Sequence, residues 1–148
     1  MHDIESPRTD DSAIEQEIQA KGLTAPRVTP DDIEANILGE CYFSAQEGVF
    51  GANGQNCYQD ISLGLLTFCV LILRNGFTVT GESACASPEN FNAEIGRRIA
   101  RENAVAKVWP LMGYALKRRL HEEAQRPVLT LADSLADLNG TPRPDHPN

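Results

Sequence analysis

The middle of the chain holds two runs whose apolar and polar positions are typical of paired β-strands. Residues 65–73 are apolar at nearly every position, and residues 77–84 begin with threonine at alternate positions. The Asn75-Gly76 pair between them is the strongest short signal for a two-residue hairpin turn. The pattern therefore predicts an antiparallel β-hairpin.

The two-residue turn determines which residues face one another across this hairpin. It pairs Ile72 with Val79 on an aliphatic face and leaves a polar strip on the opposite face. That strip consists of Thr78, Thr80 and Glu82. Because a hairpin alone is at best marginally stable, we expect a third short strand or oligomerisation to extend it and helices to cover its aliphatic face.

A long helical region is predicted directly after the hairpin. Ser87 suits the N-cap of a helix, and Pro88 suits its first position. We expect the helix to stop or kink near Val108, because Pro110 lacks a backbone donor, and a further helical segment to follow to about residue 125. The expected apolar stripe consists of Phe91, Ile95, Ile99, Val105, Ala106, Val108 and Trp109.

Before the hairpin, the sequence predicts another helix and then a long loop. Thr29 and Pro30 suit a helix start, and apolar residues at positions 33, 37, 38 and 41 predict that the helix continues toward Ala45. Residues 46–62 are rich in glycine and asparagine, so we expect a loop there. Such a long loop is either a lid or binding loop, or a variable surface connection.

Both ends of the chain are predicted to be mobile tails. Residues 1–28 are acidic with few large aliphatic side chains, and residues 126–148 are rich in proline. The first tail has the pattern of a short helix from Ser12 to Lys21, and the leucines of the second are spaced as on a docking helix. The expected fold is a single α+β domain over residues 29–125, in which a small β-hairpin sheet packs against two or three helices and disordered tails lie at both ends.

Charge narrows the classes of partner. A formal net charge of -8 and a pI near 4.8 argue against a dedicated nucleic-acid binder, since phosphate attraction supplies most of the affinity of such proteins. The charge is uneven, with nine acids against three bases in residues 1–34 and seven bases against one acid in residues 97–120. The apolar runs are too short for a membrane helix, and the N-terminus lacks the pattern of a secretory signal, so we expect neither a membrane partner nor secretion.

Candidate catalytic and metal-ligating residues are sparse. The four cysteines stand 16, 12 and 16 residues apart without a C-x-x-C pair, and the three histidines lie near the chain ends. These spacings predict no metal site, and neither Ser83 nor a cysteine has a histidine nearby to act as its base. We therefore expect a non-enzymatic protein without a cofactor.

The strongest candidate for a ligand site combines the polar strip with the arginines of the predicted helix. Arg97 and Arg101 are one helical turn apart and could grip a phosphate or carboxylate, and Thr78, Thr80 and Glu82 could present hydroxyls and a carboxylate. Alternatively, the threonines form a solvated sheet face and the arginines the solvated side of an amphipathic helix.

Three consecutive blocks carry a family resemblance. They are LTFCVLILRNGFTVTGESAC (residues 66–85), SPENFNAEIGRRIARENA (87–104) and KVWPLMGYALK (107–117). With them the chain resembles, from about Thr29 to Leu120, the gene product 49 / gene 66 family of small proteins of tailed phages and prophages. The resemblance implies a phage origin and expression in the cytoplasm of a bacterial host. It implies no activity for any particular residue.

These observations lead to one expected function and two rivals. We expect a non-catalytic phage accessory protein that binds a host protein or a small anionic ligand, forms a homo-oligomer, and blunts a host defence. The first rival is sequestration of an anionic nucleotide-like signal between the basic helix face and the threonine-rich sheet. The second is a small hydrolase that uses Glu82 or Cys69.

Overall fold

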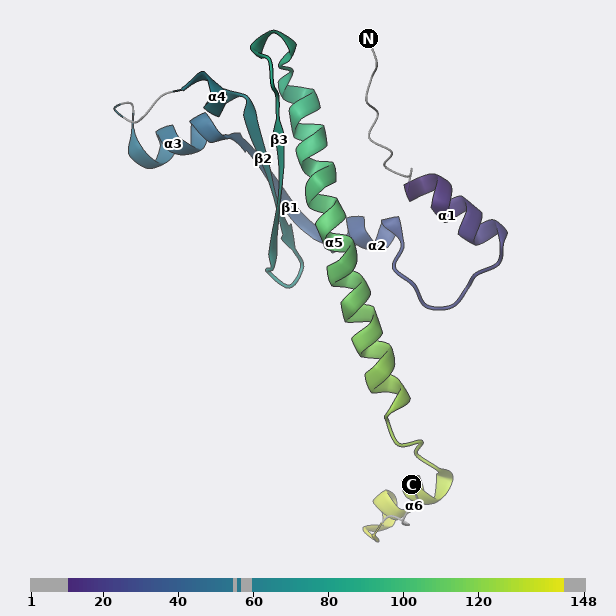
Figure 1. Ribbon diagram of the computed structural model, residues 1–148. Helices are drawn as coiled ribbons and strands as arrows, with labels where there is room; N and C mark the ends of the chain where they lie inside the picture. Colours follow the sequence, from purple (N-terminus) through teal and green to yellow (C-terminus); the bar gives the residue numbers. More distant parts are fainter. Residues whose placement is uncertain (1–10, 55, 57–59, 143–148) are drawn as a thin grey trace. The chain divides into compact units, whose positions relative to one another are not determined.

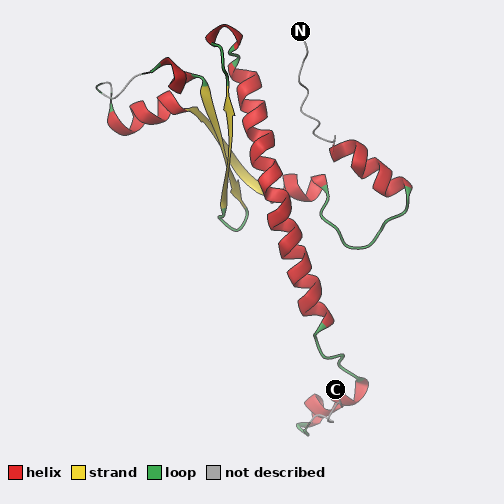
Figure 2. Cartoon of the chain, viewed as in Figure 1, coloured by secondary structure: helices red, strands yellow, loops and turns green. Residues whose placement is uncertain are grey.

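The computed structural model describes residues 11–54, 56 and 60–142. The chain divides into two compact units, Met1–Leu116 and Lys117–Asn148. The described residues form six α-helices, one short 3-10 turn and one three-stranded sheet (Figures 1 and 2), so the α+β class is confirmed. The predicted tails lie partly outside the described residues.

The sheet is antiparallel and contains β1 (Ile37–Ser44), β2 (Leu66–Leu73) and β3 (Thr78–Ala84) in the order β1-β2-β3. β1 is the expected third strand, but it occupies residues that were predicted to continue a helix. That helix prediction was wrong beyond Asn36, where α2 (Pro30–Asn36) ends. Apolar residues four apart also fit an extended strand, and Ile37, Tyr42 and Phe43 are good strand formers, so pairing with β2 decides the conformation.

The hairpin between β2 and β3 has a three-residue turn, so the predicted register was wrong by one residue. The Leu73 amide donates to the Phe77 carbonyl at 2.9 Å, and the Gly76 amide donates to the Leu73 carbonyl at 2.9 Å. Gly76 has a left-handed φ of 85°, which glycine adopts without strain and which such turns require. As a result Leu71 faces Val79 and Cys69 faces Gly81.

The sheet therefore has one inner face covered by helices and one outer face. The inner face contributes Cys69, Leu71, Leu73 and Val79 to the core. Thr78, Thr80 and Glu82 share the outer face with Phe68, Val70 and Ile72 of β2. The other core residues are Ile33 of α2 and three residues of α5, Ala100, Ala104 and Val108.

Helix α5 (Ala93–Ala124) packs on the sheet through small residues. Its buried positions are Gly96, Ala100, Ala104 and Val108, one every four residues. Ile95 and Ile99 of the predicted stripe are instead 47% and 38% exposed. The reason is the close approach to β3, because a Cβ atom added at Gly81 would lie 2.1 Å from the Ala100 carbonyl oxygen.

Helix α5 differs from the prediction both in where it starts and in that it continues past Pro110. Residues Pro88–Asn90 form a 3-10 turn, and the side chain of Asn92 accepts the Ile95 amide at 3.0 Å. Asn92 thus caps α5 in place of Ser87. The helix continues through Pro110 to Ala124, so it does not stop near Val108, and the alternative of a kink there stays a prediction. The expected helix to about residue 125 is confirmed.

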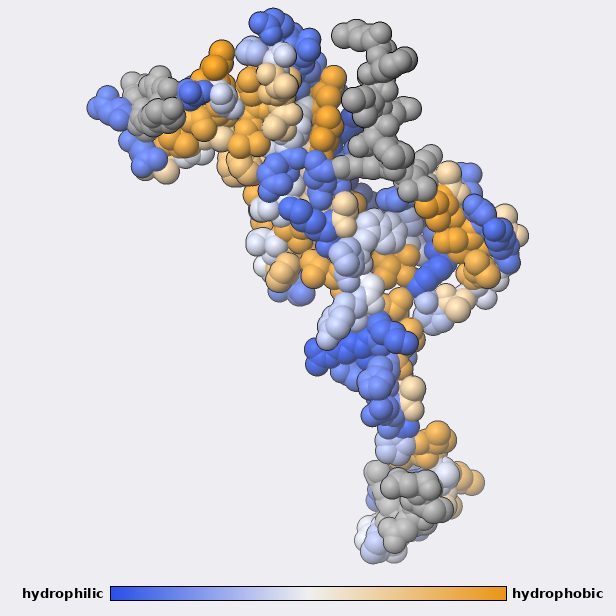
Figure 3. Space-filling model, in the orientation of Figure 1, coloured by the Kyte–Doolittle hydropathy of each residue, from blue (hydrophilic) through white to orange (hydrophobic). Residues whose placement is uncertain are grey.

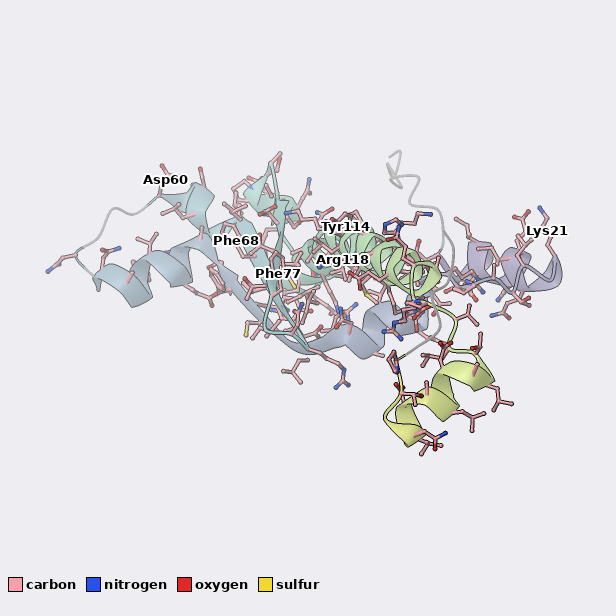
Figure 4. All side chains as sticks on the ribbon, turned by 90° about the horizontal axis from the view of Figure 1, so that it is seen from below. Lys21, Asp60, Phe68, Phe77, Tyr114 and Arg118 are labelled. Atoms are coloured by element: carbon pink, nitrogen blue, oxygen red, sulfur yellow. The ribbon has the colours of Figure 1, made fainter. Side chains whose placement is uncertain are left out.

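The segment predicted as a long loop contains two short helices. α3 (Ala45–Asn53) begins at Ser44, whose amide donates to Glu47 at 2.7 Å while its hydroxyl accepts the Glu47 amide. α4 (Ile61–Gly64) is capped by Asp60 (Figure 4). The loop prediction missed this capping box, which outweighs the glycines of α3.

Both predicted tails contain a helix. α1 (Asp11–Ala20) matches the short helix expected from Ser12, and Glu15 of α1 binds the Arg27 guanidinium. α6 (Leu131–Asn139) in the second unit starts with a capping box between Thr130 and Asp133. Its Leu131 and Leu138 are exposed, so its docking role stays a prediction. None of the described helices is long and apolar enough to cross a membrane.

Candidate functional site

A pocket of about 420 Å³ opens between β1, α3, α4 and the start of α5. Its volume lies within the range of small-molecule sites. Apolar side chains gather over α3 and the adjoining strands (Figure 3). The pocket is lined by Tyr42, Phe43, Ser44, Gln46, Glu47, Phe50, Gly64, Thr67, Phe91, Ala93 and Arg97.

Aromatic rings form the apolar part of the pocket. Phe43 of β1 stacks on Phe68 of β2 (labelled in Figure 4), with ring centroids 5.4 Å apart. Gly48 lets α3 approach Phe43, since a Cβ at this position would lie 3.4 Å from the ring. Phe50 and Phe91 come from α3 and the turn before α5. Such rings offer stacking surfaces to a planar ligand.

Arg97 is the cationic group of the pocket. It follows Gly96, whose missing side chain lets α5 lie against Thr67, because a Cβ there would be 3.1 Å from the threonine hydroxyl. Glu47, the acid of the lining, is bound to the Ser44 amide. Within the described part of the chain, Arg97 has no ion pair, so its guanidinium is available to donate hydrogen bonds to an anionic ligand.

The structure does not bring the five predicted site residues together. Arg97 lines the pocket, whereas Thr78, Thr80 and Glu82 lie on the outer face of β3. Lys107 of α5 donates to the Thr80 carbonyl at 2.6 Å, and its Nζ lies 3.8 Å from the Glu82 carboxylate. Ligand binding by the threonine strip stays a prediction, but it would not involve the same site as Arg97.

Arg101 lies in an ion-pair cluster on the inner side of the sheet. Its Nε donates to Glu40 of β1 at 2.8 Å, and its two terminal nitrogens donate to Glu34 of α2 at 3.1 and 2.8 Å. Hydrogen bonding to Arg101 lowers the pKa of Glu34, and the same contact raises the pKa of Arg101. Arg101 thus joins α5 to α2 and β1.

Replacing Arg101 by methionine is expected to lower the free energy of unfolding by about 1 kcal/mol near neutral pH, because the three groups are partly exposed. The folded-state pKa of Glu34 lies below its ordinary value of 4.5, so this stabilisation is present above that value. It is lost as the pH falls through the folded-state pKa. Urea titrations of both proteins at neutral and acidic pH measure the difference. Arg98→Met is the matched control, and an equal loss at both pH values would contradict the ion-pair role.

The groups that a hydrolase would use are poorly placed for nucleophilic chemistry. Cys69 is fully buried, and burial raises the pKa of its thiol. Burial together with Cys69 and Glu40 raises the pKa of Tyr42 to about 12. Cys85 donates its thiol to the Ser87 carbonyl at 3.2 Å. Among the described residues, no three His, Cys, Asp or Glu side chains gather as metal ligands would.

Sequence reasoning identified Arg97 but missed the aromatic rings around it. Phe50 lies in the segment assigned to a loop, and Phe91 was assigned to the core stripe. Phe43 lies in a strand that was predicted as a helix. A signal existed in the capping pattern of Ser44 and Glu47, which places Phe50 on a helix beside the strand.

Comparison with known proteins matches most of the chain to a family model. The family model described as "Phage protein (N4 Gp49/phage Sf6 gene 66) family" matches residues 28–120, a range that contains the whole sheet and every residue of the pocket. No match was found to a curated protein or to a solved structure. Helices α1 and α6 lie outside the matched range.

Proposed function

The chain belongs to the phage protein (N4 Gp49/phage Sf6 gene 66) family, and on that premise we propose that it is a non-catalytic phage accessory protein that acts inside the infected bacterium. It acts by binding a small ligand in the pocket beside Arg97. Its place of action is the host cytoplasm, and its effect is to lower the free concentration of a host molecule, as a counter-defence protein would.

The observation that supports this proposal is that aromatic rings line the pocket together with Arg97, which has no ion pair among the described residues. Phe43, Phe50 and Phe91 offer faces or edges to a flat ring, and Arg97 offers a planar fork of donors that matches a phosphate or carboxylate. Thr67 and Gln46 add polar groups that can orient the ring. The ligand class is therefore a planar aromatic compound with an anionic group, of which nucleotides are the most common in a cell.

The test is calorimetric titration of the full-length protein with a panel of nucleoside monophosphates, cyclic mononucleotides and cyclic dinucleotides. Uncharged nucleosides are the matched control ligands, because they keep the ring and lack the anion. Binding of a nucleotide with at least tenfold weaker binding of its nucleoside is expected. Absence of any heat of binding with every nucleotide of the panel would overturn the nucleotide class.

Arg97→Gln is expected to weaken binding of that nucleotide by about 10-fold to 100-fold, since hydrogen bonds to a charged group contribute about 1.5–3 kcal/mol. Arg98→Gln is the control, because Arg98 is the neighbouring exposed arginine and does not line the pocket. Calorimetric titration of both variants with that nucleotide measures the two dissociation constants. Equal weakening by the two substitutions would mean that general positive charge, and not the pocket, attracts the ligand.

The hydrolase rival has less support from the geometry. Glu82 lies 3.8 Å from the Nζ of Lys107, Cys69 is buried in the core, and neither residue lines the pocket. If Glu82→Ala or Cys69→Ala folded normally but abolished the protein's effect on the infected host, the hydrolase hypothesis would be supported.

A further inference from the structure

The two edges of the sheet differ in how their outward backbone groups are used. On β3, Lys107 and Asn103 of α5 donate to the carbonyls of Thr80 and Glu82 at 2.6 and 2.7 Å. Side chains of the helix thus occupy that edge. Unpaired edges are templates for pairing with another chain, so the opposite edge, β1, is the one to consider.

The residues of β1 that face outward follow from the alternation of the ladder. In β2, the Leu73 amide points toward β3 and the Arg74 amide toward Asn36, so even-numbered residues of β2 bond to β1. Their partners are Gly39, Cys41 and Phe43. The backbone groups of the alternate residues, Glu40 and Tyr42, therefore point away from the sheet.

The part of the β1 edge that can pair with another strand is limited at both ends. A register shift at Leu38 interrupts the ladder, and the Ser44 amide is already bound to Glu47 at 2.7 Å. Within the described chain, no hydrogen bond is made to the backbone groups of Glu40 or Tyr42 on the outward side. The edge thus offers two amides and two carbonyls.

We propose that β1 pairs antiparallel with β1 of a second copy, with Cys41 on the twofold axis. This register sets Glu40 opposite Tyr42 of the partner subunit and uses all four outward groups of each copy in four hydrogen bonds. A register centred on Glu40 would oppose two carboxylates, which is unfavourable. A register centred on Tyr42 would oppose Glu40 with the occupied Ser44.

Side chains on the outer face also fit the Cys41-centred register. It places Phe43 opposite Gly39 of the partner subunit, so that an aromatic ring covers a strand glycine, a favourable cross-strand pair. The two Cys41 side chains meet as a non-hydrogen-bonded pair, and Cys41 is exposed in the single chain. Since Ser44 and Tyr42 line the pocket, the partner's strand would also border the pocket.

The first test uses the exposed thiol as a reporter. Cα atoms of a non-hydrogen-bonded pair are about 4.5 Å apart, within the range that a disulfide spans. In a Cys57→Ser/Cys85→Ser background, oxidation by diamide is expected to give a covalent dimer, and adding Cys41→Ser is expected to abolish the link while sedimentation velocity still shows a dimer. A monomer at every concentration, or a dimer that Cys41 does not link, would overturn the proposal.

The second test separates edge pairing from stacking of the outer faces. Cys41→Lys places two like charges at the axis and is expected to raise the dissociation constant of the dimer by about fivefold or more. Thr78→Lys adds the same charge to the exposed face of β3, away from the axis, and is expected to leave the dimer unchanged. Equal weakening by both variants would overturn edge pairing in favour of face-to-face stacking. Neither test depends on the ligand proposal.

Discussion

Gly81→Ala is expected to cost about 3 kcal/mol or more of unfolding free energy and to abolish the close packing of α5 on β3. The new Cβ would lie 2.1 Å from the Ala100 carbonyl oxygen and 2.3 Å from the Ala104 amide nitrogen, and both are backbone atoms. A backbone cannot turn aside as a flexible side chain can, so the helix must move away from the sheet, which is more costly than ordinary overpacking. The midpoint and slope of urea unfolding measure the loss.

Gly113→Ala is the matched control for Gly81→Ala. Gly113 lies inside α5, and an added Cβ there meets nothing within 4 Å. The substitution is expected to raise the free energy of unfolding by up to about 1 kcal/mol, because alanine is the better helix former. If Gly81→Ala changed the stability as little as this control, the small-residue contact between α5 and β3 would not exist as described.

Leu71→Ala is expected to lower the free energy of unfolding by about 2–5 kcal/mol, since its side chain is fully buried and its removal leaves a cavity. Ile72→Ala is the comparison on the outer face of the same strand, where the side chain is only half-buried. The outer substitution is expected to cost clearly less. Urea titration of the two variants therefore tests the observed register, in which Leu71 and not Ile72 faces α5.

The same comparison bears on the outer face of the sheet. Leu66, Phe68, Val70 and Ile72 of β2 point to this face, so the strand is apolar on both sides. A nearly continuous apolar run of this kind is typical of strands that are covered on both faces. If Ile72→Ala cost as much as Leu71→Ala, a partner would cover the outer face in solution, and binding of a host protein there would become the first candidate.

Local signals predicted the parts of the fold that depend on neighbouring residues. Thr29 with Asp32 starts α2, and the Asn75-Gly76 pair marks the turn between β2 and β3. These features rest on caps and turns whose atoms lie within a few residues of one another. The family resemblance likewise needed contiguous blocks alone, and the family model confirms it over residues 28–120.

The candidate site was predictable in part. Arg97 was identified because helical spacing exposes an arginine on one side of α5, and it does line the pocket. Arg101 was identified by the same reasoning, yet its guanidinium is hydrogen-bonded to Glu34 and Glu40. The difference between the two arginines depends on which elements stand opposite the helix, and no local pattern contains that information.

By itself, the sequence determined the α+β class, the hairpin, the cap of α2, and the family. The tertiary structure alone decided that residues 37–44 form a strand, that Gly81 meets Ala100 and Ala104, and that Arg97 rather than Arg101 faces a pocket. The physical reason is that strand pairing and helix-to-sheet contact join residues tens of positions apart. Their free energy depends on register and on the distance of approach, and both are set only when the whole domain packs.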